Sequence, residues 1–126
     1  MGIFVGQTGT LDTTVDDKNV AIALKSGQVD VFSTPMMIAL MEGAAADCIK
    51  NHLEDGHVSV GTMVNITHDM ATPKGMKVTA TAVVTEIDGR TVKFDVEAHD
   101  EKGRIGKGTH ERAVVHLERF MKKFGG

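Results

Sequence analysis

The stretch that decides the fold is VFSTPMMIALMEGAAADCIK, residues 31–50. It opens on Ser33-Thr34-Pro35, where a hydroxyl side chain suits a helix N-cap and proline suits the first helical turn. The following residues are almost all apolar, and Glu42 and Asp47 are the charges among them before Lys50. A helix that is apolar on nearly every side is buried on most of its surface. The sequence therefore predicts a central helix that begins at this motif and runs to about residue 53.

Segments with strand character lie on both sides of this helix. Residues 8–15 and 19–24 have strand-like composition, and four later segments alternate between apolar and polar side chains, as strands with one buried face do. These four segments are 57–68, 76–87, 91–99 and 104–116, and a short helix is expected at about 117–123. Asp88-Gly89 is typical of a hairpin turn, so the sheet is predicted to be antiparallel.

An antiparallel sheet wrapped around one long buried helix is the hot-dog architecture, an α+β fold, and we predict it as a single domain over residues 1–126. A meander with the helix packed on it in another way is the alternative that the pattern leaves open. The small residues Gly43-Ala44-Ala45-Ala46 of the helix would let a neighbouring backbone come close.

Composition excludes several classes of protein. The chain has 126 residues, 14 basic and 17 acidic side chains that are interspersed, a formal charge of −3 and no Trp or Tyr. This pattern argues against a nucleic-acid partner. The single cysteine, Cys48, excludes a disulfide scaffold. The start of the chain has no signal-peptide pattern and no apolar run is long enough to cross a membrane, so we expect a cytoplasmic protein.

Three polar residues stand where the pattern calls for something else. Glu42 lies within the apolar helix, so we expect it to be paired or held protonated, either for chemistry or as a structural acid at a dimer contact. His68 ends the 57–68 segment on the face predicted for Val58, Val60, Val64 and Ile66, which points it at the helix. A His–Glu pair there would suit acid–base catalysis, and a satisfied core histidine is the alternative.

Thr34 is the third of these residues, and its hydroxyl lies at the helix N-terminus. It is either an ordinary cap or a group beside the positive helix end, where developing negative charge is stabilised. Thr34 and Glu42 are separated by about 12 Å along the helix axis, so their side chains cannot touch. Either the imidazole of His68 bridges much of this gap, or His68 of a second subunit completes the site. His52 and His57 match no strong metal-ligand spacing, and no metal site is predicted.

Three segments carry a resemblance to a known family: VFSTPMMIALMEGAA, VGTMVNITHDMATPKGMKVT and IGKGTHERAVVHLERF. Together they resemble the fluoroacetyl-CoA-thioesterase-like branch of the hot-dog thioesterases from about Val31 to Phe124, with their relative spacing kept. The resemblance implies a homodimer that binds acyl-CoA near the subunit interface, with dimers of dimers left open. It places the catalytic roles on Thr34, Glu42 and His68.

The resemblance also implies a backbone-contact glycine at Gly61 and an arginine near the acyl pocket at Arg112. Arg112 alternates in phase with Val114, which would point it inward, and a surface ion pair is the alternative. In fluoroacetyl-specific members, aromatic residues before the helix close over the acyl group. Here that stretch reads LKSGQVD and the nearest aromatic is Phe32, so no aromatic lid is expected. We expect Phe32 and Met37 to contact the substrate. Met36, Met37 and Met41 could line an adaptable apolar pocket, and core packing is the alternative for these methionines.

The predicted function is hydrolysis of a short or small acyl-CoA to the free acid and coenzyme A, with no metal or separate cofactor. In this interpretation His68 is the general base and later the acid, tuned by Glu42. The nucleophile is Thr34, a water held by Thr34, or Glu42 itself. The alternative is a non-catalytic acyl-CoA-binding module that senses or sequesters its ligand. A hot-dog hydratase is a third possibility, for which His68-Asp69 is the sole candidate pair.

Overall fold

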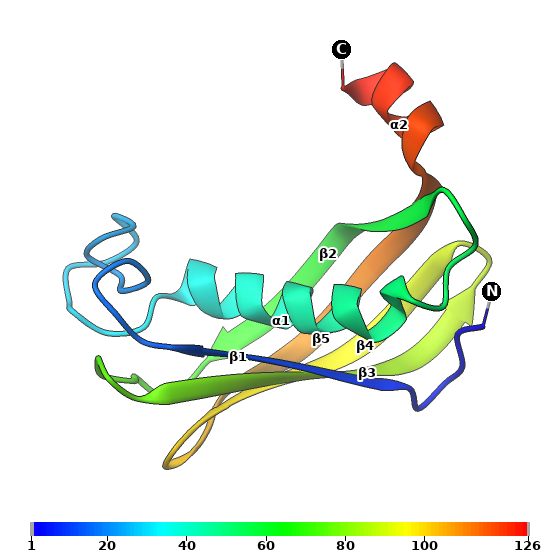
Figure 1. Ribbon diagram of the computed structural model, residues 1–126. Helices are drawn as coiled ribbons and strands as arrows, with labels where there is room; N and C mark the ends of the chain where they lie inside the picture. Colours follow the sequence, from blue (N-terminus) through cyan, green and yellow to red (C-terminus); the bar gives the residue numbers. More distant parts are fainter. Residues whose placement is uncertain (1, 126) are drawn as a thin grey trace.

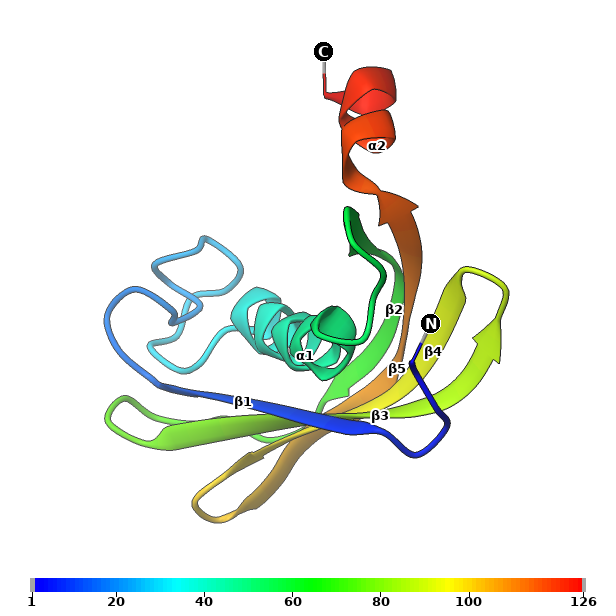
Figure 2. The ribbon, with the colours of Figure 1, turned by 45° about the vertical axis from the view of Figure 1, so that its right-hand side comes forward.

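The chain forms one curled antiparallel sheet with a long helix lying across its concave face (Figures 1 and 2). This computed structural model describes residues 2–125. Its elements are β1 (Thr8–Thr14), α1 (Thr34–Lys50), β2 (His57–His68), β3 (Lys77–Asp88), β4 (Thr91–Asp100), β5 (Gly103–His116) and α2 (Leu117–Phe124). The spatial order β1-β3-β4-β5-β2 leaves β1 and β2 at the two edges. The predicted α+β arrangement is confirmed.

Helix α1 begins as predicted and ends slightly early. The Ser33 hydroxyl accepts a hydrogen bond from the Met36 amide at 3.2 Å, and a proline lies in the first turn. The helix ends at Lys50, because the next amides bond back to the Ile49 carbonyl in a tighter turn. Its buried side is made of Met37, Leu40, Met41, Ala44, Ala45, Cys48 and Ile49.

Strand β1 crosses α1 at very short range. A Cβ atom placed on Gly9 would lie 2.5 Å from the Ala44 carbonyl oxygen and 2.6 Å from Cys48 Cβ. Only glycine fits such a gap. The predicted close approach of a backbone to the small residues of the helix is therefore confirmed, and the backbone is that of β1.

Strands β3 and β4 carry the centre of the core. The residues expected to face inward are all buried: Val78, Ala80, Ala82 and Val84 on β3, and Val92, Phe94, Val96 and Ala98 on β4. The alternation of these two strands predicted their faces correctly, because neither is interrupted over the stretch that covers α1.

The segment 19–24 is not a strand, so that prediction was wrong. Val20 makes one isolated bridge to Phe32, and the residues between them turn back on themselves. Local hydrogen bonds, such as Ser26 amide to Ala21 carbonyl at 3.0 Å, take the place of strand pairing. We call residues 20–31 the entry loop. It stands beside the N-terminal end of α1, on the left of Figure 1.

A β-bulge changes the face of β2. The pairing of β2 with β5 shifts between Gly61 and Met63, so that Gly61 lies opposite Arg112 while Val64 lies opposite His110. One extra residue reverses the alternation, because side chains change face at every residue. His68, Ile66 and Val64 point to the helix side as predicted. Val58 and Val60 do not, and Ser59 and Gly61 take their place.

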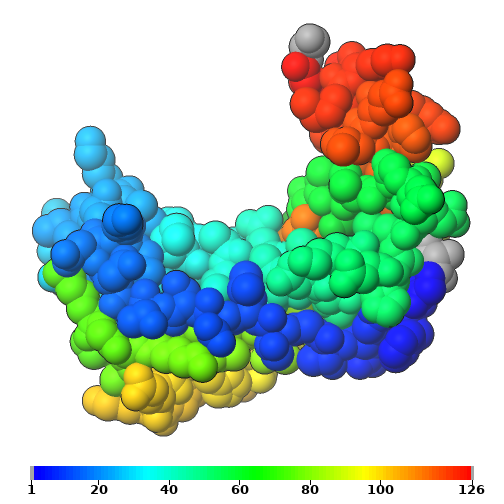
Figure 3. Space-filling view, in the orientation of Figure 1, coloured from blue at the N-terminus to red at the C-terminus, as the bar shows by residue number. Residues whose placement is uncertain are grey.

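The outer edge of β2 and helix α2 bear on how the chain could meet a second subunit. Among residues 2–125, no strand pairs with the outer edge of β2, and α2 projects away from the sheet (Figure 2). In the space-filling view, α1 lies at the floor of a hollow between the entry loop and α2 (Figure 3). No helix within residues 2–125 combines the length and hydropathy that crossing a bilayer requires.

Candidate active site

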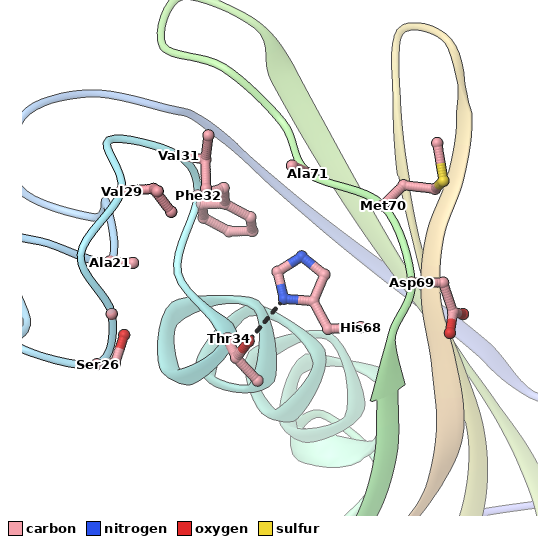
Figure 4. A pocket seen from close by; sticks show the side chains of 11 residues that line it. Ala21, Ser26, Val29, Val31, Phe32, Thr34, His68, Asp69, Met70 and Ala71 are labelled. Carbon is pink, nitrogen blue, oxygen red and sulfur yellow. Dashed lines mark hydrogen bonds between the residues drawn. The ribbon is translucent and has the colours of Figure 1, made fainter.

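The first polar pair of the site joins the start of α1 to the end of β2. Thr34 Oγ1 lies 2.7 Å from His68 Nδ1, a hydrogen-bond distance (Figure 4). The neighbouring Ser33 supplies the helix cap. The hydroxyl of Thr34 is therefore not the cap of α1, and it contacts the imidazole instead.

The surroundings of His68 favour its neutral form. Burial lowers the pKa of its imidazole, and the Met70 carbonyl and Asp69 carboxylate oppose that shift only in part. Its Nε2 is buried and has no hydrogen-bond partner of ordinary geometry among residues 2–125. A neutral ring that accepts the Thr34 proton at Nδ1 carries its own proton on Nε2. This arrangement suits a general base at neutral pH.

A cavity of about 280 Å³ opens over this pair. Its apolar wall comes from the entry loop and the segment after it: Ala21, Val29, Val31 and Phe32. These side chains lie on one side of the imidazole, and Met70 and Ala71 lie on the other (Figure 4). Phe32 is placed in the lining as predicted. Met37 is not, because its position on α1 points it into the core, where its sulfur packs over Gly106.

The second polar group, which we call the arginine cluster, consists of Glu42, Ser59, Gly61, His110 and Arg112. Arg112 is 7% exposed and points inward, as its phase with Val114 predicted. Its Nε donates to Ser59 Oγ at 2.8 Å and its Nη2 donates to the Ser59 carbonyl at 3.0 Å. Its Nη1 lies 3.9 Å from Glu42 Oε2. A guanidinium held in this way fixes a positive charge beside Glu42.

His110 was missed by the sequence reasoning. It is 1% exposed, and its ring stacks on Phe94 with centroids 6.0 Å apart. Its Nδ1 lies 2.7 Å from the Met63 carbonyl oxygen, and its Nε2 lies 3.2 Å from Arg112 Nη1. Burial lowers the pKa of His110, and the charge of Arg112 lowers it further. Its shared phase with Arg112 and Val114 on one strand was the signal that could have found it.

Glu42 has a partner, as expected, and that partner is Arg112, whose Nη1 lies 3.9 Å from Glu42 Oε2. The expectation that Glu42 is buried was wrong, because its side chain is 41% exposed. The predicted His–Glu pair is not formed within the chain. A Cβ on Gly61 would lie 2.8 Å from Glu42 Oε2, so glycine leaves room for the carboxylate. The two polar groups are separated by about 12 Å along α1.

Comparisons with known proteins show the family to which the chain belongs. The sequence profile described as FlK, fluoroacetyl-CoA-specific thioesterase, matches residues 15–118. The chain belongs to this family. The fluoroacetyl-CoA thioesterase of Streptantibioticus cattleyicolor is 47% identical over 94 residues, which are 75% of this chain and 68% of that protein.

Solved structures place the family on the hot-dog fold. A structure of the fluoroacetyl-CoA thioesterase FlK superposes with a TM-score of 0.91 at 40% identity, over 98% of this chain and 96% of that one. A hot-dog-like protein from Thermanaerovibrio acidaminovorans superposes with a TM-score of 0.84 at 25% identity, over 97% and 93% of the two chains. As a member of the fluoroacetyl-CoA-specific thioesterase family, the chain is a thioester hydrolase that acts on small acyl-CoA thioesters.

Within residues 2–125, no three His, Cys, Asp or Glu side chains gather closely enough to hold a metal ion. The Thr34–His68 pair offers a hydroxyl and a neutral base, and the arginine cluster offers a carboxylate with a fixed charge beside it. Coenzyme A enters as part of the substrate.

Proposed function

We propose that the chain hydrolyses a short acyl-CoA through Thr34, His68 and Glu42, releasing the free acid and coenzyme A. The observation that carries this proposal is the 2.7 Å contact between Thr34 Oγ1 and His68 Nδ1 at the floor of an apolar cavity. A related FlK structure, 40% identical, is a complex with fluoroacetate and CoA. The same kind of ligand fits a cavity with one apolar wall and one polar floor.

The reaction starts with proton transfer to a neutral base. His68 Nδ1 takes the proton of the Thr34 hydroxyl as its oxygen attacks the thioester carbonyl, or it takes a proton from a water that Thr34 holds. The tetrahedral oxyanion forms near the positive end of α1. When the C–S bond breaks, the imidazolium returns the proton to the CoA thiolate. If Thr34 was acylated, a water then hydrolyses the ester by the same proton transfers.

The acyl group is proposed to be small. The cavity over the pair is about 280 Å³, and Phe32, which is 1% exposed, is part of its lining. The entry loop brings Val29 and Val31, but no aromatic side chain, to this wall. An aromatic lid over the acyl group is therefore not proposed, and fluoroacetyl-CoA is one candidate among short acyl-CoAs rather than the assigned substrate.

We further propose that the site is shared between two subunits of a homodimer. Within residues 2–125 the outer edge of β2 is unpaired, and its Val64 is 43% exposed, which is typical of a strand that pairs with another chain. If two β2 edges pair antiparallel about Asn65, the bulge brings Gly61 of one subunit opposite His68 of the other. Glu42, which lies against Gly61, would then face the thioester held by Thr34 and His68 of the partner subunit.

Glu42 in that position faces the reacting carbonyl from the opposite side. Its carboxylate can direct the hydrolytic water, or attack the thioester to give an anhydride. Both roles need the charge that Arg112 keeps beside it. The dimer also covers part of the open face of α1 seen in Figure 3. The free thiol of Cys48 agrees with a cytoplasmic enzyme.

The test is release of free thiol from a panel of acyl-CoAs by the wild-type protein and by the His68→Ala variant. We expect turnover of one short acyl class that the substitution abolishes. His99→Ala is the matched control, because His99 is an exposed histidine on β4 and should leave turnover unchanged. Thermal stabilisation by acyl-CoA with no thiol release would instead establish the acyl-CoA-binding module.

A further inference from the structure

His110 is a buried histidine that touches neither Thr34 nor His68, yet both of its ring nitrogens are used. Nδ1 faces the Met63 carbonyl oxygen at 2.7 Å, and Nε2 faces Arg112 Nη1 at 3.2 Å. A core histidine needs its polar atoms satisfied. Here one of those atoms is satisfied by a charged side chain of the arginine cluster, which links His110 to the proposed chemistry.

The partners of His110 determine where its proton lies. A carbonyl oxygen only accepts hydrogen bonds, so the proton is on Nδ1 and Nε2 presents a lone pair. Arg112 Nη1 donates to that lone pair. A second proton on the ring would place two donors against each other in a site that is 1% exposed. The contact therefore exists only with the neutral ring, in this one tautomer.

The guanidinium of Arg112 is held at each of its three nitrogens. Ser59 receives two of the hydrogen bonds, at 2.8 and 3.0 Å, and His110 receives the third, from Nη1. Nη1 is also the Arg112 nitrogen that lies 3.9 Å from Glu42 Oε2. The His110 contact therefore holds the corner of the guanidinium that faces the carboxylate. Without it, the planar group is held by Ser59 alone and can turn on those two hydrogen bonds, which moves Nη1 relative to Glu42.

We infer that His110 is a positioning residue, which holds Arg112 and, through Arg112, the carboxylate of Glu42. The inference rests on the proposed function for the role of Glu42, and it adds a residue that touches neither substrate nor Thr34 nor His68. The β-bulge in β2 also contributes to the position of His110. The Met63 carbonyl that orients the His110 ring belongs to the first residue after the shift in register between β2 and β5.

Two variants separate the positioning role from a structural one. In His110→Gln the side-chain oxygen lies near the position of Nε2 and can still accept from Arg112. In His110→Asn the amide lies near the position of Nδ1, so it can donate to the Met63 carbonyl but leaves Arg112 Nη1 unpartnered. Both variants lose the ring that stacks on Phe94, and we expect similar losses of thermal stability.

We expect His110→Gln to keep kcat within about threefold of wild type. We expect His110→Asn to lose at least about tenfold in kcat with little change in KM, as for a lost hydrogen bond to a charged group. Equal losses of activity in both variants would show that His110 only fills space. Full activity of His110→Asn would show that Arg112 needs no such support. Either result overturns the inference.

A second readout keeps the inference testable if the proposed function fails. The Nη resonances of Arg112, observed by nitrogen-15 NMR, should show slow rotation and slow proton exchange in wild type and in His110→Gln. In His110→Asn both should become fast. If wild type releases no thiol but this pattern appears, the proposed function is wrong and the His110–Arg112 link stands. If the pattern is absent, the link itself is wrong.

Discussion

Mixing two inactive variants would test whether the site is shared between subunits. The structure joins Thr34 and His68 within one chain at 2.7 Å, while Glu42 lies about 12 Å further along α1. In a dimer with shared sites, a Glu42→Gln chain paired with a His68→Ala chain has one fully intact site. That site combines the Glu42 of the second chain with the Thr34 and His68 of the first.

The size of the recovery follows from this geometry. After complete subunit exchange at equal concentrations, about half of the dimers are mixed, and each mixed dimer has one intact site of two. We therefore expect about one quarter of the wild-type rate of thiol release. The exchange can be followed by native mass spectrometry with one chain tagged, and activity should rise in step with the mixed dimer.

A control pair comes from the other half of the site. Because Thr34 and His68 lie in the same chain, a mixture of Thr34→Ala and His68→Ala has no intact site in any dimer, and its activity should not recover. If the Glu42→Gln and His68→Ala mixture forms mixed dimers but stays inactive, Glu42 acts in its own chain and the proposed pairing of β2 edges is wrong.

Three other substitutions or conditions give separate tests. Gly61→Ala should push the flexible Glu42 carboxylate aside and lower kcat by about tenfold or more. The free energy of unfolding should change by less than about 1 kcal/mol. A variant with the kcat of wild type would contradict this prediction. Gly9→Ala should lower the free energy of unfolding, measured by chemical denaturation, by about 1–3 kcal/mol, because the new Cβ meets the fixed Ala44 carbonyl. An unchanged denaturation midpoint would mean that β1 can move away from α1. Burial lowers the pKa of His68 below 6.5. At pH values below 6.5 the unfolded chain therefore binds more protons than the folded chain does. The free energy of unfolding should therefore fall as pH drops below 6.5, and it should fall less in His68→Ala. In the same pH range kcat/KM should stay on its plateau down to a pH below 6.5. A fall in kcat/KM already above pH 6.5 would argue against a neutral His68.

Much of the fold was predictable because its signals are local and regular. The apolar helix from Pro35 and the alternation in β3 and β4 predicted both the elements and their buried faces. The segment 19–24 failed because short apolar runs occur in loops as well as in strands, and here Ile22 and Leu24 are exposed. Its composition carries no information about which distant strand it would pair with.

The site was predictable in its residues but less so in its arrangement. Thr34, Glu42 and His68 stood out because each breaks an apolar or structural pattern. The bulge at Thr62 did not, since one extra residue in a strand leaves the composition unchanged while it reverses the faces on one side of the bulge relative to the other. That reversal is what brings Ser59 and Gly61 to Arg112. His110 was missed because an alternating strand hides a buried histidine among its inward residues.

Ser33 and Thr34 carry two different roles, which affects how the sequence can vary. The Ser33 hydroxyl caps α1 and the Thr34 hydroxyl contacts the His68 imidazole, so each position requires a side chain for a different reason. Asp or Asn at Ser33 would still cap the helix, whereas neither carries the hydroxyl that Thr34 presents to His68. Substitutions that keep a capping side chain at position 33 can therefore accumulate without altering the chemistry. A substitution at position 34 can alter the chemistry while the cap at position 33 keeps the helix in place.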